Sequence, residues 1–405
     1  MRQIVTIIIL SSFCFGIQAQ NRVQHTINSN WGFYKGNADV DDQDISWHDV
    51  TIPHSWNVDD VMDDEPGYYR DTACYKKDLY IPSEWKDKQV FIIFDAIGIN
   101  ADIYVNETLA RSHTGAYTSF NVDITDYIDF TEDGNTKVRL FIRANNTFTD
   151  DVAPLSADFT FFGGIYRDVH LLALDKVHFR MDQYNSKGVF WNTPKVSEKS
   201  VKIVLNGAFS SKLAKMKEVS VEHILYSKNG EKVLSHIEAY KNNGNETTPF
   251  SCKIRLRKPE LWSPENPNLY RLVSRLEVDG KIVDEIENPI AFRWFEFDAE
   301  EGFSLNGEPY HLVGASRHQD YENMGNALDD ALHLRDIELL KEMGGNFLRI
   351  AHYPQDETII QACDRMGILC SIEIPLVNAI TQSEAFFNNA EFMLREMMAQ
   401  YYNHP

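Results

Sequence analysis

Three short segments in the last quarter of the sequence combine arginine, histidine and carboxylate side chains. Arg317-His318-Gln319-Asp320 follows one apolar run. Arg349 and His352 lie at the end of a second run, and Glu373 lies at the end of a third. Charged and imidazole groups that converge on a cleft suit hydrogen bonding to hydroxyl-rich or anionic ligands. Each residue alone is as often part of a structural ion pair, so the prediction of a binding cleft depends on all three segments.

The three apolar runs are predicted strands, and amphipathic helices alternate with them from about residue 303 onward. The predicted strands are 311–315, 346–351 and 367–374, and the predicted helices are 331–343, 357–366 and 384–402. This alternation is typical of a (β/α)8 barrel, in which active residues lie at the C-terminal ends of the strands. Such a barrel takes about 250 residues. We therefore expect residues 294–405 to form the first three βα units of an incomplete (β/α)8 TIM barrel.

Two regions upstream show the short alternating runs that are typical of β-sandwiches. Residues 20–174 contain no helical stripe and predict a jelly roll. Residues 175–293 predict an immunoglobulin-like sandwich without a disulfide. The clearest predicted strands are 90–94, 101–105, 138–142, 201–205, 219–226 and 270–276. The predicted fold class is therefore a multidomain β plus α/β protein.

The N-terminus has the pattern of a secretory signal peptide over residues 1–19. A positive Met1-Arg2 precedes an apolar run, and Ile17-Gln18-Ala19 is a suitable cleavage site. A buried N-terminal strand is the alternative. No later stretch is apolar for the roughly 18 residues that a membrane span needs. We expect an exported protein, periplasmic or extracellular in a bacterial-type cell, with no membrane partner.

Composition excludes other classes of partner. Asp and Glu number 60 against 39 Lys and Arg, so the net charge is −21. Nucleic acid and anionic membranes are excluded as partners because association would begin with repulsion. The acidic runs 39–44 and 59–65 lack the spacing of a calcium loop, and the cysteines lack zinc spacing. We expect no metal and no cofactor.

Several longer motifs resemble glycoside hydrolase family 2, the family of β-galactosidases, β-glucuronidases and β-mannosidases. Residues 346–354, followed by 363–369, resemble its first signature, and 314–320 resemble its first barrel strand. Similar motifs of its sugar-binding and immunoglobulin-like domains lie at 52–57, 103–106, 163–169 and 261–270. The resemblance covers nearly all of the chain after the signal peptide, in the family's order.

The resemblance implies retaining hydrolysis of terminal β-glycosides, most simply by a β-galactosidase. Two carboxyl groups about 5 Å apart do this work. In the family, the acid/base Glu follows an Asn-His-Pro that resembles Asn403-His404-Pro405. We therefore expect both catalytic Glu residues to be missing from these 405 residues, so that this fragment alone is inactive. The partner would be a β-linked oligosaccharide or glycoside.

The resemblance also assigns substrate-binding roles. It implies that Arg349 braces the catalytic centre, and that His352 and His318 contact sugar hydroxyls. Asp158 stands where the family sends a loop of the sandwich into the barrel mouth. Glu373 would orient its neighbours. The structural alternatives are a turn for Asp158, a buried imidazole for His318 and an ion pair with the next strand for Arg349.

A second class of function stays open at this point. A non-catalytic, carbohydrate-binding or structural β-sandwich protein with a vestigial barrel would carry the same two sandwiches. The sequence does not separate galactose, glucuronate and mannose as the sugar, and it leaves the oligomeric state open.

Overall fold

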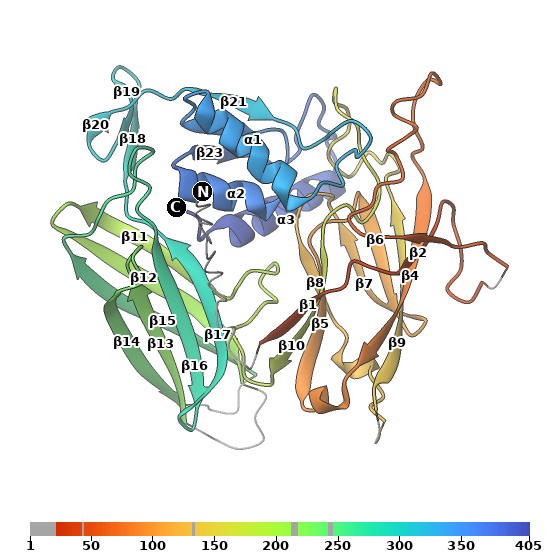
Figure 1. Cartoon of the computed structure of the whole chain (residues 1–405), viewed down its shortest axis with the longest axis horizontal. Coiled ribbons are helices and arrows are strands. Elements are labelled where there is room, and N and C mark those ends of the chain that lie inside the picture. The colour runs from red at the N-terminus through yellow and green to blue at the C-terminus, as the bar shows by residue number, and fades with distance from the viewer. Residues whose placement is uncertain (1–21, 43, 132–133, 212–217, 242–245) are drawn as a thin grey trace, which may run out of the picture.

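The computed structural model describes residues 22–42, 44–131, 134–211, 218–241 and 246–405. Figure 1 shows two β-sandwiches side by side, with a helical part above and between them. The first sandwich runs from red to yellow, the second is green and teal, and the helical part is blue. The predicted signal peptide, residues 1–19, lies outside the described residues.

The first sandwich consists of a six-stranded and a four-stranded sheet. The six-stranded order is β3-β2-β4-β9-β6-β7 and the four-stranded order is β1-β10-β5-β8, all antiparallel. Alternate residues such as Val90, Ile92 and Phe94 are fully buried between the sheets. The strands are β1 Val23–Thr26, β2 Trp31–Tyr34, β3 His48–Val50, β4 Thr72–Ile81, β5 Lys88–Phe94, β6 Asn100–Val105, β7 Thr108–Thr114, β8 Phe120–Asp123, β9 Thr136–Asn145 and β10 Val169–Asp175. Two short 3-10 turns, Ser83–Trp85 and Thr125–Tyr127, flank β5 and β8.

The second sandwich packs a three-stranded sheet, β11-β12-β15, against a four-stranded sheet, β14-β13-β16-β17. Its core is apolar and includes Phe209, Leu205 and Leu276. The strands are β11 Val189–Ser197, β12 Ser200–Ser210, β13 Glu218–Tyr226, β14 Lys232–Lys241, β15 Thr247–Arg257, β16 Tyr270–Val278 and β17 Lys281–Ile290. Cys74, Cys252, Cys363 and Cys370 are all free thiols. Together with the parallel strands below, these sandwiches confirm the predicted fold class.

The last part contains a small antiparallel sheet and then a parallel one. The antiparallel sheet has β18 Phe295–Asp298, β19 Gly302–Leu305 and β20 Glu308–Pro309, and it was not predicted. The parallel sheet has β21 Gly314–Arg317, β22 Phe347–Ile350 and β23 Leu369–Ile372, in that order. The helices are α1 Asp330–Glu342, α2 Glu357–Met366 and α3 Glu384–Tyr401. None of the helices formed by the described residues has the length and apolarity needed to span a membrane.

The first parallel strand lies further along the chain than the predicted strand 311–315. Pairing with β22 begins at Gly314, opposite Phe347, and continues to Arg317. A Cβ atom at Gly314 would lie 1.8 Å from the carbonyl oxygen of Phe347, so the close approach of the two strands requires glycine there. Tertiary pairing thus places Arg317 inside the strand and His318 directly after it.

Local signals explain where the helices of this part begin and end. Asp356 accepts a hydrogen bond from the Thr358 amide and caps α2, which ends at Gly367 with φ of 70°. Ser383 caps α3 through the Phe386 amide. Apolar residues of α1 and α2 cover one side of the strands, where Leu348 and Ile350 are buried. The strand ends therefore present their polar residues on a supported platform.

Candidate functional site

Arg349 and Glu373 form the centre of the site at the C-terminal ends of β22 and β23. Arg349 lies opposite Ser371 in the parallel register, which brings Glu373, just after β23, alongside it. The Nε–Oε1 distance is 2.5 Å and the Nη2–Oε2 distance is 2.9 Å. The hydrogen bonds from Arg349 lower the pKa of Glu373. Both side chains stay accessible, at 44% and 31% exposure, so a ligand can reach them.

Two histidines extend this pair across the mouth. His352 Nδ1 lies 3.2 Å from Arg349 Nη2 and 3.6 Å from Glu373 Oε2. His318 lies after β21, its ring 5.4 Å from that of His352, and its Nδ1 lies 3.1 Å from Tyr353 Oη. Burial lowers the pKa of His318, which is therefore a neutral imidazole near pH 7. A neutral imidazole both donates and accepts, as contact with hydroxyl groups requires.

A loop of the first sandwich completes the mouth. The Phe159 ring stacks on His352 with centroids 5.9 Å apart, and lies 5.2 Å from the His318 ring. The neighbouring Asp158 is exposed and lines a depression together with His318. The structure thus brings Asp158, His318, Arg349, His352 and Glu373 around one mouth. Their roles toward a ligand stay predictions.

Sequence reasoning missed two aromatic residues of this site. Phe159 forms the contact between the sandwich loop and both histidines. Tyr353 is buried, stacks on Tyr117 at 4.2 Å and holds His318 through its hydroxyl group. Both are sequence neighbours of predicted site residues, Asp158 and His352, and that adjacency was the only signal for them.

A second arginine, Arg317, lies on the opposite side of the parallel strands. It is 9% exposed, and its Nε lies 2.8 Å from Asp336 of α1. Its Nη1 donates to Gln355 at 2.6 Å, and its Nη2 lies 3.0 Å from His333. Burial lowers the pKa of His333 to about 4. This cluster joins the strands to the helices that cover them and does not face the mouth.

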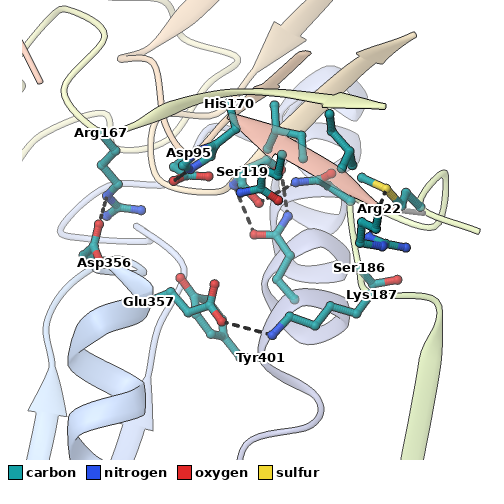
Figure 2. Close-up of a pocket in the computed structure, with 16 residues that line it drawn as sticks. Arg22, Asp95, Ser119, Arg167, His170, Ser186, Lys187, Asp356, Glu357 and Tyr401 are labelled. Atoms are coloured by element: carbon teal, nitrogen blue, oxygen red, sulfur yellow. Dashed lines mark hydrogen bonds and ion pairs between the residues drawn. The ribbon is translucent and has the colours of Figure 1, made fainter. Parts of the chain in front are cut away.

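Another pocket, of about 260 Å³, lies where the two sandwiches meet α2 and α3, and Figure 2 shows its lining. Each of its cations, apart from Arg22, faces an anion of the pocket itself. The pairs are Arg167–Asp356 at 3.8 Å, His170–Asp95 at 3.1 Å and Lys187–Glu357 at 3.5 Å. Arg22 is held by Asp284 of the second sandwich at 2.9 Å. Because these charges already have partners across the junction, we assign the pocket to domain packing rather than to the functional site.

These observations define a class of protein. Two β-sandwiches support the first strands of a parallel barrel, and the polar mouth at the strand ends is closed on one side by a sandwich loop. The chain belongs to glycosyl hydrolases family 2. Three models of that family match it: the sugar binding domain over residues 25–175, the family 2 model over 187–293 and the TIM barrel domain over 298–400.

The relatives of this chain include proteins named for two specificities. The β-glucuronidase of Bacteroides fragilis is 34% identical over 99% of this chain and 57% of its own. The β-galactosidase of Thermoanaerobacterium thermosulfurigenes is 30% identical over 94% and 52%. One similar solved structure is a calcium binding mutant of Bacteroides uniformis β-glucuronidase 2, in which two aspartates are replaced by alanine. It matches with a TM-score of 0.88 and 39% identity, over 95% of this chain and 46% of its own. The chain thus spans about half the length of the relatives it matches.

Proposed function

We propose that this chain forms the substrate-binding half of a retaining glycosidase that hydrolyses terminal β-glycosides. The observation that carries the proposal is the Arg349–Glu373 pair, flanked by His318 and His352 under the sandwich loop. A fixed guanidinium, a carboxylate and two imidazoles are the donors and acceptors that sugar hydroxyls need. Family membership supplies the reaction class.

Glu373 acts in this proposal as a positioning residue. A general acid must hold a proton near the working pH, which requires a raised pKa. Hydrogen bonds from Arg349 lower the pKa of Glu373 instead. We therefore do not assign Glu373 as the general acid.

Two terminal sugars are candidates. A β-glucuronide is supported by the names of the Bacteroides relatives at 34% and 39% identity. A β-galactoside is supported by the β-galactosidase relative, and by the fact that Glu373 already neutralises Arg349. Arg349 is therefore not a free partner for the carboxylate of a uronate.

The test is hydrolysis by the full-length native protein. The 4-nitrophenyl β-glycosides of glucuronate, galactose and mannose would be compared by kcat/KM, with the anomer of the first product followed by NMR. We expect one glycoside to be preferred and a β-anomer to be released first. No turnover of any β-glycoside, or release of an α-anomer, would contradict the proposal. Binding of a sugar without turnover would favour the alternative of a non-catalytic, carbohydrate-binding protein.

We also propose that the protein is exported, on the pattern of residues 1–19. N-terminal sequencing of the protein from cell fractions tests this. A mature chain that begins at Gln20 outside the cytoplasm is expected, and a cytoplasmic chain that still begins at Met1 would contradict it.

A calcium site is a further proposal, and it departs from the prediction that the protein binds no metal. The two aspartates replaced in the Bacteroides uniformis mutant have the same sequence separation as Asp330 and Asp356 here. Asp330 begins α1 and Asp356 caps α2. Burial, and then the charges of Asp356 and Asp168, raise the pKa of Asp330, so these carboxylates are crowded.

The described residues contain no group of three or more His, Cys, Asp or Glu side chains that could hold a metal. Backbone carbonyls and water would have to supply the other oxygen ligands that Ca²⁺ takes. The test is the melting temperature of the full-length protein with Ca²⁺ and with a chelator. We expect Ca²⁺ to raise it in the wild type and in the control Asp298→Asn, but not in Asp330→Asn. An equal rise in all three would contradict the site.

A further inference from the structure

A depression on the rim of the mouth gathers polar groups that the proposed chemistry does not use. It lies between the sandwich loop 155–161, the end of β21 and a segment just before β4. We call it the rim pocket, and it is defined by Tyr68, Arg70, Asp158, Phe161, His318 and Asp320. His318 and Asp158 belong both to this pocket and to the mouth, so a ligand in one can extend into the other.

Arg70 is held in one orientation within the rim pocket. Its guanidinium lies over the Phe161 ring, 4.8 Å from the centroid, and its Nε donates to the carbonyl of Asn146 at 3.0 Å. The Phe161 amide donates to Tyr68 Oη at 3.0 Å, which fixes the ring beneath. Both Nη groups of Arg70 lack an acceptor within the described part of the chain. They are pre-oriented donors, so a ligand would bind them at little entropic cost.

The acceptors of the rim pocket are two carboxylates. Asp158 and Asp320 are both exposed, and neither has a hydrogen bond or ion pair within the residues that the structure describes. His318 adds no positive charge near pH 7, since burial lowers its pKa. Two carboxylates against one guanidinium make the pocket net negative, which disfavours an anionic ligand. A neutral ligand rich in hydroxyl groups satisfies both the donors and the acceptors.

We propose that the rim pocket binds a neutral sugar unit that is linked to the sugar held in the mouth. The Arg70 Nη groups donate to oxygens of this unit, and Asp320 accepts from its hydroxyl groups. Asp158 lies between the two units. This inference rests on the proposed glycosidase function and makes Arg70 and Asp320 determinants of substrate choice, a role that the sequence pattern had not indicated for Arg70.

The test compares two substrates of the full-length protein that share the preferred terminal sugar. One is its 4-nitrophenyl glycoside, and the other is a disaccharide in which that sugar is β-linked to a neutral hexose. We expect Arg70→Ala to lower the ratio of kcat/KM for the disaccharide over the nitrophenyl glycoside about tenfold, and Asp320→Asn to lower it severalfold. Arg70→Lys keeps the positive charge but loses the planar set of guanidinium donors. Its kcat/KM ratio should therefore lie between those of Arg70→Ala and the wild type. The control is Arg255→Ala, an exposed arginine of the second sandwich that bonds Ser200 at 3.0 Å.

If this kcat/KM ratio stays unchanged in both Arg70→Ala and Asp320→Asn, the proposal is overturned. This holds whether the two kcat/KM values stay the same or fall equally. If the wild type hydrolyses neither substrate, the glycosidase function fails. Calorimetric titration with the disaccharide then decides the rim pocket: binding lost in Arg70→Ala supports it, and no binding to the wild type overturns it.

Discussion

Arg317 and Arg349 make the same kind of ion pair in two different surroundings. Both lie on neighbouring parallel strands, Arg349 directly opposite Ser316. Arg317 is 9% exposed and binds Asp336 within the helix layer. Arg349 is 44% exposed and binds Glu373 in the open mouth. The strand pleat sends adjacent positions to opposite sides, so one residue of register separates the two environments.

Burial, rather than the chemistry of the ion pair, decides whether such a pair contributes to the stability of the fold. A buried charge that loses its partner is left uncompensated, so the Arg317 cluster stabilises the fold. An exposed pair adds little to stability, because water and salt screen it. We therefore propose that the Arg349 pair presents fixed donors and acceptors to a ligand.

The largest effect is expected from Arg317→Met. The substitution removes a buried cation, leaves the half-buried Asp336 without its partner and removes the bonds to Gln355 and His333. We expect the free energy of unfolding to fall by about 3–5 kcal/mol. Urea unfolding measures it. Arg335→Ala, on the exposed face of α1, is the control and should change stability by less than about 0.5 kcal/mol. If Arg317→Met lowers the free energy of unfolding by less than about 1 kcal/mol, the proposed difference between the Arg317 and Arg349 pairs is wrong.

Glu373→Gln tests the other half of the comparison. The amide cannot hold Arg349 and His352 as the carboxylate does, so we expect kcat/KM to fall about a hundredfold. Stability should change by less than about 1 kcal/mol, because the pair is exposed. Steady-state kinetics and urea unfolding of the full-length protein are measured together. Wild-type activity with a large loss of stability would assign this pair to the fold as well.

The pH dependence of stability separates the two clusters further. His333 has a pKa of about 4 in the fold against 6.5 in the unfolded chain, so unfolding takes up a proton between these values. Stability therefore falls as the pH drops from 6.5 toward 4, and we expect His333 to contribute about 1–2 kcal/mol to the loss between pH 7 and pH 5. Glu373 has a lowered pKa, so its contribution is present above about pH 4.5 and is lost only below it. Chemical unfolding at pH 7 and pH 5 should show a smaller difference for His333→Gln than for the wild type. An equal difference would contradict this assignment.

The smallest effect is expected from Asp158→Asn, which probes a mouth residue without a partner in the described structure. Loss of one charged hydrogen bond to a sugar hydroxyl should lower kcat/KM about threefold to tenfold. The melting temperature should not move, because Asp158 is exposed on a loop. Asp150→Asn, on an earlier part of the same connection, is the matched control. A fall in melting temperature with unchanged kcat/KM would restore the interpretation of Asp158 as a turn residue.

Local patterns predicted much of this architecture. The bounds of α2 were predicted without error, because an N-cap aspartate and a C-terminal glycine enclose its apolar stripe. The three parallel strands were predicted as well, and with them the positions of Arg349 and Glu373 at one edge. The first strand was misplaced, because its apolar residues precede the segment that pairs with β22. The sheet of β18 to β20 was missed, since its short strands carry little periodicity.

By itself, the sequence determined the element types, their order and the family, because strand alternation, helix stripes and caps are local properties of the chain. Only the tertiary structure decided that Phe159 of the first sandwich stacks on His352 of the barrel, and that Arg70 lines the rim pocket together with His318. These contacts join residues far apart in the chain. Their geometry depends on how the domains pack, and no local pattern records it.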